Sequence, residues 1–295
     1  MCAFRLAALI GAVAGLVPQL CRADADGPGY PLIRSITALE VGAETAGWSG
    51  VQDADGVLYF GSYSLVRYDG DRWRSFPING SYAIRSLDWG PNRRLWAGAI
   101  GEIGWFAESK GEWRYQSLRG YLPADHPEIG DVWHALAWGD GAVFASEEYL
   151  LRWDGRELKS WSFPGSRHLQ AFRVGADILF QYRPKGLFIL RENGPELIAP
   201  STLIGDLAIF WIGKTDGGWL LLKNDGLFRL AHRGLNPVGE TANAYLKKHG
   251  TVAAKAMPDG RLAIGTMDDG IAFITQDGRL TNVLNSATGF GAGSA

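Results

Sequence analysis

The hydrophobic pattern of the chain is a series of short apolar runs, each preceded by a polar turn that contains glycine. One phrase recurs, as P-K-G-L-F-I-L at Pro184–Leu190, N-D-G-L-F-R-L at Asn224–Leu230 and D-D-G-I-A-F-I at Asp268–Ile274. A turn of Asp, Asn, Pro or Gly followed by a few apolar residues is typical of a strand that begins after a tight turn. The pattern therefore predicts many short β-strands.

The recurring phrase anchors six similar units. Each unit is predicted to contain a short strand, a turn, an apolar strand, a second turn, the anchor strand and a short fourth strand. Successive anchors lie 38, 47, 37, 40 and 44 residues apart, measured at Tyr68, Phe106, Trp153, Leu190, Leu230 and Ile274. Four strands in about 40 residues is the spacing of a β-propeller blade.

Burial explains why such a unit must be repeated. One four-stranded sheet leaves its faces exposed, whereas sheets packed around an axis cover one another and leave only short edges. Helical solenoids have similar periods, but these units are rich in β-branched and aromatic residues with frequent turns, as strands are. We therefore predict an all-β fold, a β-propeller of four-stranded blades in which the third strand carries the phrase.

A strand-like segment, Pro31–Thr37, precedes the first full unit. Propellers commonly close when a strand of this kind completes the last blade. The sixth unit already has its own fourth strand at Leu280–Leu284. We therefore expect six full blades plus an N-terminal closing strand, an incomplete seven-bladed ring whose chain ends in the connection to the seventh blade. The alternative is a six-bladed ring in which the leading strand is an extra edge.

The first residues have the features of an export signal. One positive charge in Met1–Arg5 precedes the apolar run Leu6–Val17, and small residues lead to a cleavage point after Ala23. The run is too short to be a bilayer-spanning anchor. We predict a signal peptide at 1–23, a propeller domain at 24–295 and a periplasmic product with no membrane segment after cleavage.

Composition narrows the function classes. The chain is 46% hydrophobic and 20% charged with a formal net charge of -2, without the basic excess of nucleic-acid-binding proteins. Its 40 glycines and 12 tryptophans fit tight turns and half-buried sheet surfaces. Both cysteines, Cys2 and Cys21, lie in the predicted signal peptide. The exported domain is therefore expected to have no disulfide, no thiolate metal site and no cysteine nucleophile.

Several motifs carry a family resemblance. They are P-L-I-R-S-I-T, G-W-S-G-V-Q-D-A-D-G-V-L-Y-F-G and L-V-R-Y-D-G-D-R-W-R-S-F within Pro31–Phe76, S-L-D-W-G-P-N-R-R-L-W-A-G-A-I-G-E-I-G-W-F at Ser86–Phe106, G-D-V-W at Gly130–Trp133 and P-D-G-R-L-A-I-G-T at Pro258–Thr266. The chain resembles the bacterial two-component regulator propellers, the periplasmic ligand-binding sensor domains of hybrid histidine kinases and of regulators with a triple-tyrosine motif. The likeness covers nearly all of the predicted mature chain, and its motifs mark blade architecture rather than ligand identity.

The resemblance also implies a context for the propeller. In that family a tyrosine-rich β-sandwich, a membrane helix and a kinase or DNA-binding region follow it. None of these follows here, so we expect a C-terminally truncated sensor, a split gene product or a free-standing binding module.

Candidate ligand-binding residues come from the innermost strands, which line the central channel of a propeller. Superposing the six units places the following residues on these strands or one step away: Trp48, Arg85, Trp133, His134, Gln170, Trp211 and Lys255. Aromatic faces stack on sugars, whereas arginine and glutamine bind hydroxyl or carboxylate groups. The competing interpretation of each residue is a structural role in blade packing or in a turn.

No pattern indicates a catalytic residue, a cofactor or a metal. The acidic turns Asp53–Gly56 and Asp216–Gly218 lack the further oxygens of a calcium loop, so we interpret them as turns. The histidines have no metal-ligand spacing, and His134 and His168 are expected to lie near each other as ordinary hydrogen-bonded side chains. The acidic pair Glu147–Glu148 is expected to be solvated.

Two connections between units are long, Arg119–Asp131 and Gly239–Gly250, and the second predicts a short helix. They either shape a ligand or partner surface or are tolerated insertions.

The favoured function is a non-enzymatic, exported sensor propeller that binds a small molecule or an oligosaccharide at the channel mouth. A signalling protein or a second propeller is a further candidate partner, and no nucleic acid is expected. One alternative is a propeller enzyme acting on glycans, a lyase or hydrolase, which needs an acid/base pair that the sequence does not reveal. Another is a scaffold that pairs through the exposed edge of its last blade.

Overall fold

The computed structural model describes most of the propeller region of the chain. The described residues are 36, 38–41, 47–78, 83–109, 112–124, 128–166, 168–231 and 234–288. The chain divides into two units, Met1–Ile33 and Arg34–Ala295, and all described residues belong to the second. The predicted signal peptide and nearly all of the predicted closing strand therefore lie outside the described residues.

The described residues of the second unit form six sheets, each of four antiparallel strands that follow one another in the chain. Blades 1 to 3 comprise β1–β4 (Ser49–Gln52, Leu58–Gly61, Leu65–Tyr68, Trp73–Phe76), β5–β8 (Ile84–Trp89, Leu95–Ala99, Glu102–Ser109, Glu112–Ser117) and β9–β12 (His134–Trp138, Gly141–Ala145, Tyr149–Trp153, Leu158–Ser162). Blades 4 to 6 comprise β13–β16 (Gln170–Val174, Asp177–Tyr182, Gly186–Arg191, Gly194–Pro200), β17–β20 (Ile209–Thr215, Gly218–Lys223, Gly226–Ala231, Gly234–Pro237) and β21–β24 (Ala253–Ala256, Leu262–Gly265, Ile271–Ile274, Leu280–Leu284).

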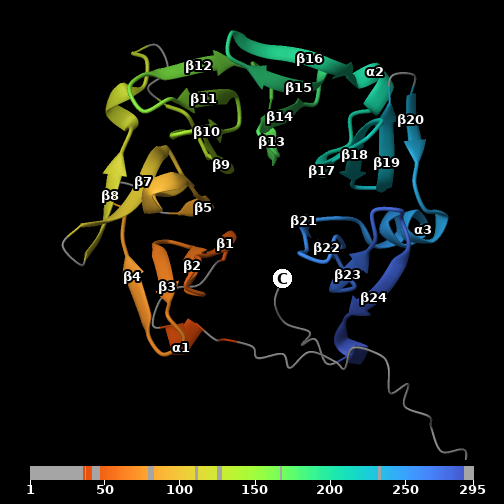
Figure 1. Ribbon diagram of the computed structural model, residues 1–295, viewed down its shortest axis with the longest axis horizontal. Helices are drawn as coiled ribbons and strands as arrows, with labels where there is room; N and C mark the ends of the chain where they lie inside the picture. The colour runs from red at the N-terminus through yellow and green to blue at the C-terminus, as the bar shows by residue number, and fades with distance from the viewer. Residues whose placement is uncertain are drawn as a thin grey trace, which may run out of the picture. The chain divides into compact units, whose positions relative to one another are not determined.

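The blades are arranged as a propeller, as the repeat predicts. Figure 1 shows the first strand of each blade on the inside, from β1 to β21, and the fourth strand on the outside, from β4 to β24. Consecutive inner strands are neighbours from blade 1 to blade 6. Each anchor residue lies in a third strand, so the interpretation of the recurring phrase is confirmed.

The glycine of the phrase is required by the backbone. Gly186 and Gly226 have φ angles of +135° and +149°, a region that side chains disfavour. A Cβ atom on Gly186 would overlap the carbonyl oxygen of Ala199, and one on Gly226 would lie 2.6 Å from Asn243 Oδ1. Each third strand of this type therefore begins at a position where the chain turns sharply and other groups approach closely.

The core lies between blades. Adjacent residues of a strand point to opposite faces of the sheet, so in β6 Leu95 packs toward blade 1 while Trp96 packs toward blade 3. In β18, Leu221 likewise packs toward blade 4 and Leu220 toward blade 6. Five clusters of buried side chains join consecutive blades in this way. No sixth cluster among the described residues joins blade 6 to blade 1.

Helices are few and short in the described part of the chain. They are α1 (Ala38–Val41), α2 (Ser201–Ile204), α3 (Glu240–His249) and three 3₁₀ turns, Pro91–Arg93, Arg119–Tyr121 and Ser286–Thr288. The predicted helix in the long connection before blade 6 is confirmed as α3. Within the described ranges, none of the helices has the length and apolar character that a membrane crossing requires.

Helix α3 is fixed to blades 5 and 6. It buries Ala242 and Leu246 in the cluster between these blades. Asn243 accepts a hydrogen bond from the Leu227 N–H (2.7 Å) and donates one to the Leu227 carbonyl (3.2 Å). This long connection is therefore an ordered segment that packs against blades 5 and 6.

Candidate functional site

A cationic and aromatic stack lies where the inner strands begin. The guanidinium of Arg85, at the start of β5, lies between two indole rings, 4.4 Å from the centroid of Trp48 and 4.8 Å from that of Trp133. Its Nε and Nη2 atoms are 3.1 and 2.9 Å from Asp131 Oδ2. Blades 1 and 2 are thereby connected to the segment that precedes blade 3. The arginine side chain is 15% exposed, so its charge is held by groups of the protein itself.

The stack continues into blade 4 through two histidines. The Trp133 indole stacks on the His168 imidazole with centroids 5.1 Å apart. His168 Nε2 is 3.4 Å from His134 Nε2, so one ring nitrogen donates and the other accepts. The predicted proximity of His134 and His168 is confirmed. At the other end, Tyr63 packs edge-on against Trp48 at 5.2 Å and is 48% exposed.

We call Trp48, Arg85, Asp131, Trp133, His134 and His168 the inner-strand cluster. Burial lowers the pKa of His134 to about 3; repulsion from His168, once that residue is protonated, acts in the same direction, and a hydrogen bond with Gln170 acts against it. Burial also lowers the pKa of His168 to about 4, and Arg183 acts in the same direction. Both imidazoles are therefore neutral at neutral pH and act as hydrogen-bonding and stacking groups.

Four of the predicted site residues belong to this cluster, namely Trp48, Arg85, Trp133 and His134. A fifth, Gln170 at the start of β13, adjoins it through His134. Sequence reasoning placed the arginine and both indoles near each other but missed Asp131, which holds the guanidinium. The sequence offered one indication that Asp131 lies near the arginine, because Asp131 is two residues before Trp133.

Lys255 lies near a different group of charges. It contributes a charge interaction to Asp88, near the end of β5. Asp88 Oδ2 accepts a hydrogen bond from the Ala137 N–H (2.8 Å), and Arg173 Nη2 lies 3.1 Å from Asp88 Oδ1. Burial raises the pKa of Asp88, although Arg173 and Lys255 act against that shift. This carboxylate links the inner strands of blades 2, 3 and 4 near the ends of β5, β9 and β13, whereas the cationic and aromatic stack lies where the inner strands begin.

Trp211 packs between blades. It belongs to the cluster of buried and half-buried side chains between blades 5 and 6. A Cβ atom on Gly213 would overlap its indole ring, so that glycine leaves space for it. Trp211 is therefore not brought together with the inner-strand cluster.

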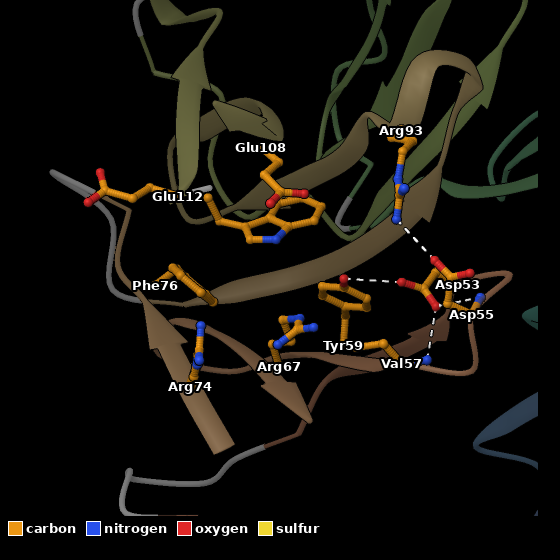
Figure 2. Close-up of a pocket in the computed structure, with 11 residues that line it drawn as sticks. Asp53, Asp55, Val57, Tyr59, Arg67, Arg74, Phe76, Arg93, Glu108 and Glu112 are labelled. Carbon is orange, nitrogen blue, oxygen red and sulfur yellow. Dashed lines mark hydrogen bonds and ion pairs between the residues drawn. The ribbon is translucent and has the colours of Figure 1, made fainter. Parts of the chain in front are cut away.

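A second candidate site is a cavity between blades 1 and 2, with a volume of about 400 Å³ (Figure 2). We call it the inter-blade cavity. Its lining residues come from the β1–β2 turn, from β2, β3 and β4, from the turn before β6 and from the β7–β8 hairpin: Asp53, Asp55, Val57, Tyr59, Arg67, Arg74, Phe76, Arg93, Glu108, Glu112 and Trp113. None of them was singled out from the sequence as a ligand-binding residue.

The acidic turn at one end of this cavity has a structural explanation. Asp53 Oδ1 accepts hydrogen bonds from the Asp55 and Val57 N–H groups at 3.0 and 2.9 Å. Asp53 Oδ2 accepts one from the Tyr59 hydroxyl at 3.2 Å, and Asp55 pairs with Arg93. The interpretation of this segment as a turn is confirmed. Among the described residues, no group of three or more His, Cys, Asp or Glu side chains is arranged to hold a metal ion.

The fold is shared with solved structures of low sequence identity. Two structures of the extracellular domain of BT4673 from B. thetaiotaomicron, described as a one component system and as a hybrid two component system, match with TM-scores of 0.59 at 17% and 16% identity. Each match covers 82% of this chain and 34% or 33% of the other. The WD40 β-propeller domain of Doa1 matches with a TM-score of 0.56 at 15% identity over 78% of each chain. This chain has their fold.

PorZ of Porphyromonas gingivalis, described as a bacterial surface component of the type-IX secretion system, also matches, with a TM-score of 0.57 at 14% identity over 82% of this chain and 42% of PorZ. In the BT4673 matches, by contrast, the chain spans only about a third of the length of the other structure. No protein-family model matches the sequence, and the search of curated proteins found no match.

Proposed function

We propose that this chain is an exported, ligand-binding propeller of the sensor type and that its ligand binds at the inner-strand cluster. The observation that supports this most is the stack of two indoles, a guanidinium and two imidazoles that spans blades 1 to 4. The likeness of its fold to extracellular domains of BT4673 supports the sensor role. The predicted signal peptide supports export to the periplasm.

The chemistry of the cluster favours a carbohydrate. Aromatic rings with a polar group at one edge bind the apolar faces of sugars while neighbouring donors bind hydroxyl groups. Tyr63 offers an exposed ring and hydroxyl beside Trp48. Gln170 is half-buried and supplies an amide next to His134. A ligand that contacts several blades at once would also favour one relative arrangement of those blades, which is a route from binding to signalling.

A matched pair of tyrosines tests this site. Purified protein is screened by thermal shift against a panel of oligosaccharides, and a ligand should raise the melting temperature. For the best oligosaccharide, Tyr63→Ala is expected to weaken binding roughly tenfold because it removes a stacking ring. Tyr121→Ala is the control, since Tyr121 is 55% exposed and also packs on a tryptophan, Trp153, away from the cluster.

The outcome separates the candidate functions. Equal weakening by both tyrosine variants, or no stabilising oligosaccharide in a broad panel, contradicts a carbohydrate site at the inner-strand cluster. Degradation of a glycan by the purified protein, lost in an Asp131→Asn variant, would instead favour the enzyme alternative. The scaffold alternative stays a prediction, and co-purification of a partner that requires the last blade would favour it.

A further inference from the structure

The inter-blade cavity has a floor formed by one row of side chains. Tyr59 in β2 pairs directly with Arg67 in β3, and Arg67 pairs directly with Arg74 in β4. Directly paired residues of antiparallel strands project from the same face, with Cβ atoms about 5 Å apart. A phenol and two guanidinium groups therefore lie side by side on the face of blade 1 that is turned toward blade 2.

The two arginines are only partly neutralised by the protein. Arg67 Nη1 is 3.0 Å from Asp69 Oδ2, but its Nε is buried without a hydrogen-bond partner. Arg74 has no ion pair or hydrogen bond to any described residue, and it is exposed. Like charges placed directly opposite each other destabilise a sheet. An anionic group bound between them would remove that repulsion.

The opposite wall carries an unpaired negative charge. Glu108 in β7 pairs directly with Trp113 in β8, so both project from one face of the hairpin. Glu108 has no ion pair or hydrogen bond in the described part of the chain, whereas Glu112 is bound to Arg114 at 3.0 Å. Figure 2 shows Glu108 on one side of the cavity and Arg67 and Arg74 on the other. These groups of opposite charge face each other across the cavity without bonding.

Between the charges the walls are apolar. Val57, Tyr59, Phe76 and Trp113 line the cavity, and the rings of Tyr59 and Trp113 are 5.4 Å apart. An indole face also attracts a cation. A volume of about 400 Å³ lies within the range of small-molecule sites. The cavity thus combines an anion-binding side, a cation-binding side and an apolar wall.

We propose that the inter-blade cavity binds a small zwitterion with an apolar side chain, that is, a free amino acid or a dipeptide. Its carboxylate binds the guanidinium groups of Arg74 and Arg67, its ammonium group binds Glu108 beside Trp113, and its side chain packs against Phe76 and the aromatic wall. This site is separate from the inner-strand cluster and does not depend on the function proposed for it.

Binding of L-phenylalanine and of L-leucyl-L-phenylalanine to the purified protein, measured by isothermal titration calorimetry, tests this proposal. We expect saturable binding of at least one of them. For L-phenylalanine, N-acetyl-L-phenylalanine lacks the ammonium group and phenethylamine lacks the carboxylate. Each analogue is expected to bind roughly tenfold more weakly, because each loses one charged contact.

Variants assign the contacts to residues. Arg74→Gln is expected to weaken binding of the zwitterion roughly tenfold and to leave binding of phenethylamine unchanged, because phenethylamine has no carboxylate. Glu108→Gln is expected to weaken binding of the zwitterion by a similar factor and to leave binding of N-acetyl-L-phenylalanine unchanged, because that analogue has no ammonium group. The controls are Arg72→Gln and Glu157→Gln, exposed charges outside the cavity. A melting temperature unchanged from that of the wild type shows that each variant is folded.

Three results would overturn the proposal. One is the absence of saturable binding of both zwitterions up to about 10 mM. Another is equal weakening by Arg72→Gln and Arg74→Gln, which would mean that overall charge rather than the cavity controls binding. The third is tighter binding of D-glucuronate than of either zwitterion with the same dependence on Arg74, which would assign the cavity to an acidic sugar.

Discussion

The inner-strand cluster and the inter-blade cavity both combine arginine, carboxylate and aromatic side chains, but their charges are arranged differently. In the cluster, Arg85 is held between two indoles and bonded to Asp131, so the charge is already compensated. In the cavity, Arg74 and Glu108 lie on opposite walls, and neither has an ion pair among the described residues. The charges of the cluster hold neighbouring blades together, whereas Arg74 and Glu108 in the cavity remain available to a ligand.

This difference shows that residue types alone do not identify a binding site. A compensated charge that is mostly buried stabilises the arrangement of the strands that supply it, and its removal leaves its partner uncompensated. An uncompensated charge beside an apolar cavity contributes little to folding and is available to a ligand. Replacing the compensated charge of the cluster should therefore change stability, whereas replacing an uncompensated charge of the cavity should change binding of the zwitterion.

The largest expected effect is on stability at the cluster. Arg85→Ala removes the cation between the indoles and leaves the Asp131 carboxylate without its partner, so we expect the free energy of unfolding to fall by about 2–4 kcal/mol. Urea denaturation measures this change. Arg74→Ala in the cavity is the matched control. Equal losses of stability in the two variants would remove the distinction between the sites.

The next effect is on the pH dependence of stability. In the unfolded chain both histidines become protonated near pH 6.5, whereas in the folded chain His168 stays neutral to about pH 4 and His134 to about pH 3. The unfolded state therefore binds more protons in this window, and the free energy of unfolding falls as the pH drops from 6.5 toward 4.

Replacing one imidazole should reduce that dependence. His168→Phe keeps a ring against Trp133 but removes a titrating group, so its melting temperature should fall less than that of the wild type between pH 7 and 4.5. Thermal denaturation followed by circular dichroism measures both profiles. Profiles of equal slope would show that the pair does not control acid stability.

The smallest effect is expected at the cavity in the absence of ligand. Arg74→Gln removes a charge directly opposite Arg67, so stability should be unchanged or higher by a few tenths of a kcal/mol. Chemical denaturation measures it. A loss above about 1 kcal/mol would show that Arg74 has a structural role, which would weaken the case that it is held for a ligand.

The sequence was sufficient to predict the fold because the blade is a local unit. Glycine turns, short apolar runs and their spacing are all visible within about 40 residues. The anchor strands, the strand at Leu280–Leu284 and helix α3 were therefore predicted at or near their observed positions. The predicted closing strand and the signal peptide stay predictions, because almost all of their residues lie outside the described part of the chain.

Site residues were predicted less well because one position in a strand decides which face a side chain occupies. Strands β5 and β17 both contain an irregularity after their first residue, at Arg85 and at Phe210. If Ile84 is matched to Ile209, the equivalent of Arg85 is Phe210, and Trp211 corresponds to Ser86. Phe210 and Trp211 both pack against the cluster of buried side chains between blades 5 and 6.

The inter-blade cavity was missed for a related reason. It is formed by facing surfaces of two blades, and no single motif contains its residues. One signal was available: in D-R-W-R the arginines Arg72 and Arg74 alternate with Trp73, so Arg74 projects from the face opposite to the tryptophan. Placing Arg67 beside it required the register of β3 and β4, which the sequence alone did not provide.

The pairing of strands that are consecutive in the chain has a consequence for biosynthesis. Each blade is complete once its own four strands are available, and each new blade finds its predecessor already present as a packing surface. Such a chain can acquire structure vectorially as it leaves the ribosome, without waiting for distant segments. Kinetic barriers should therefore arise mainly where one blade docks on the next.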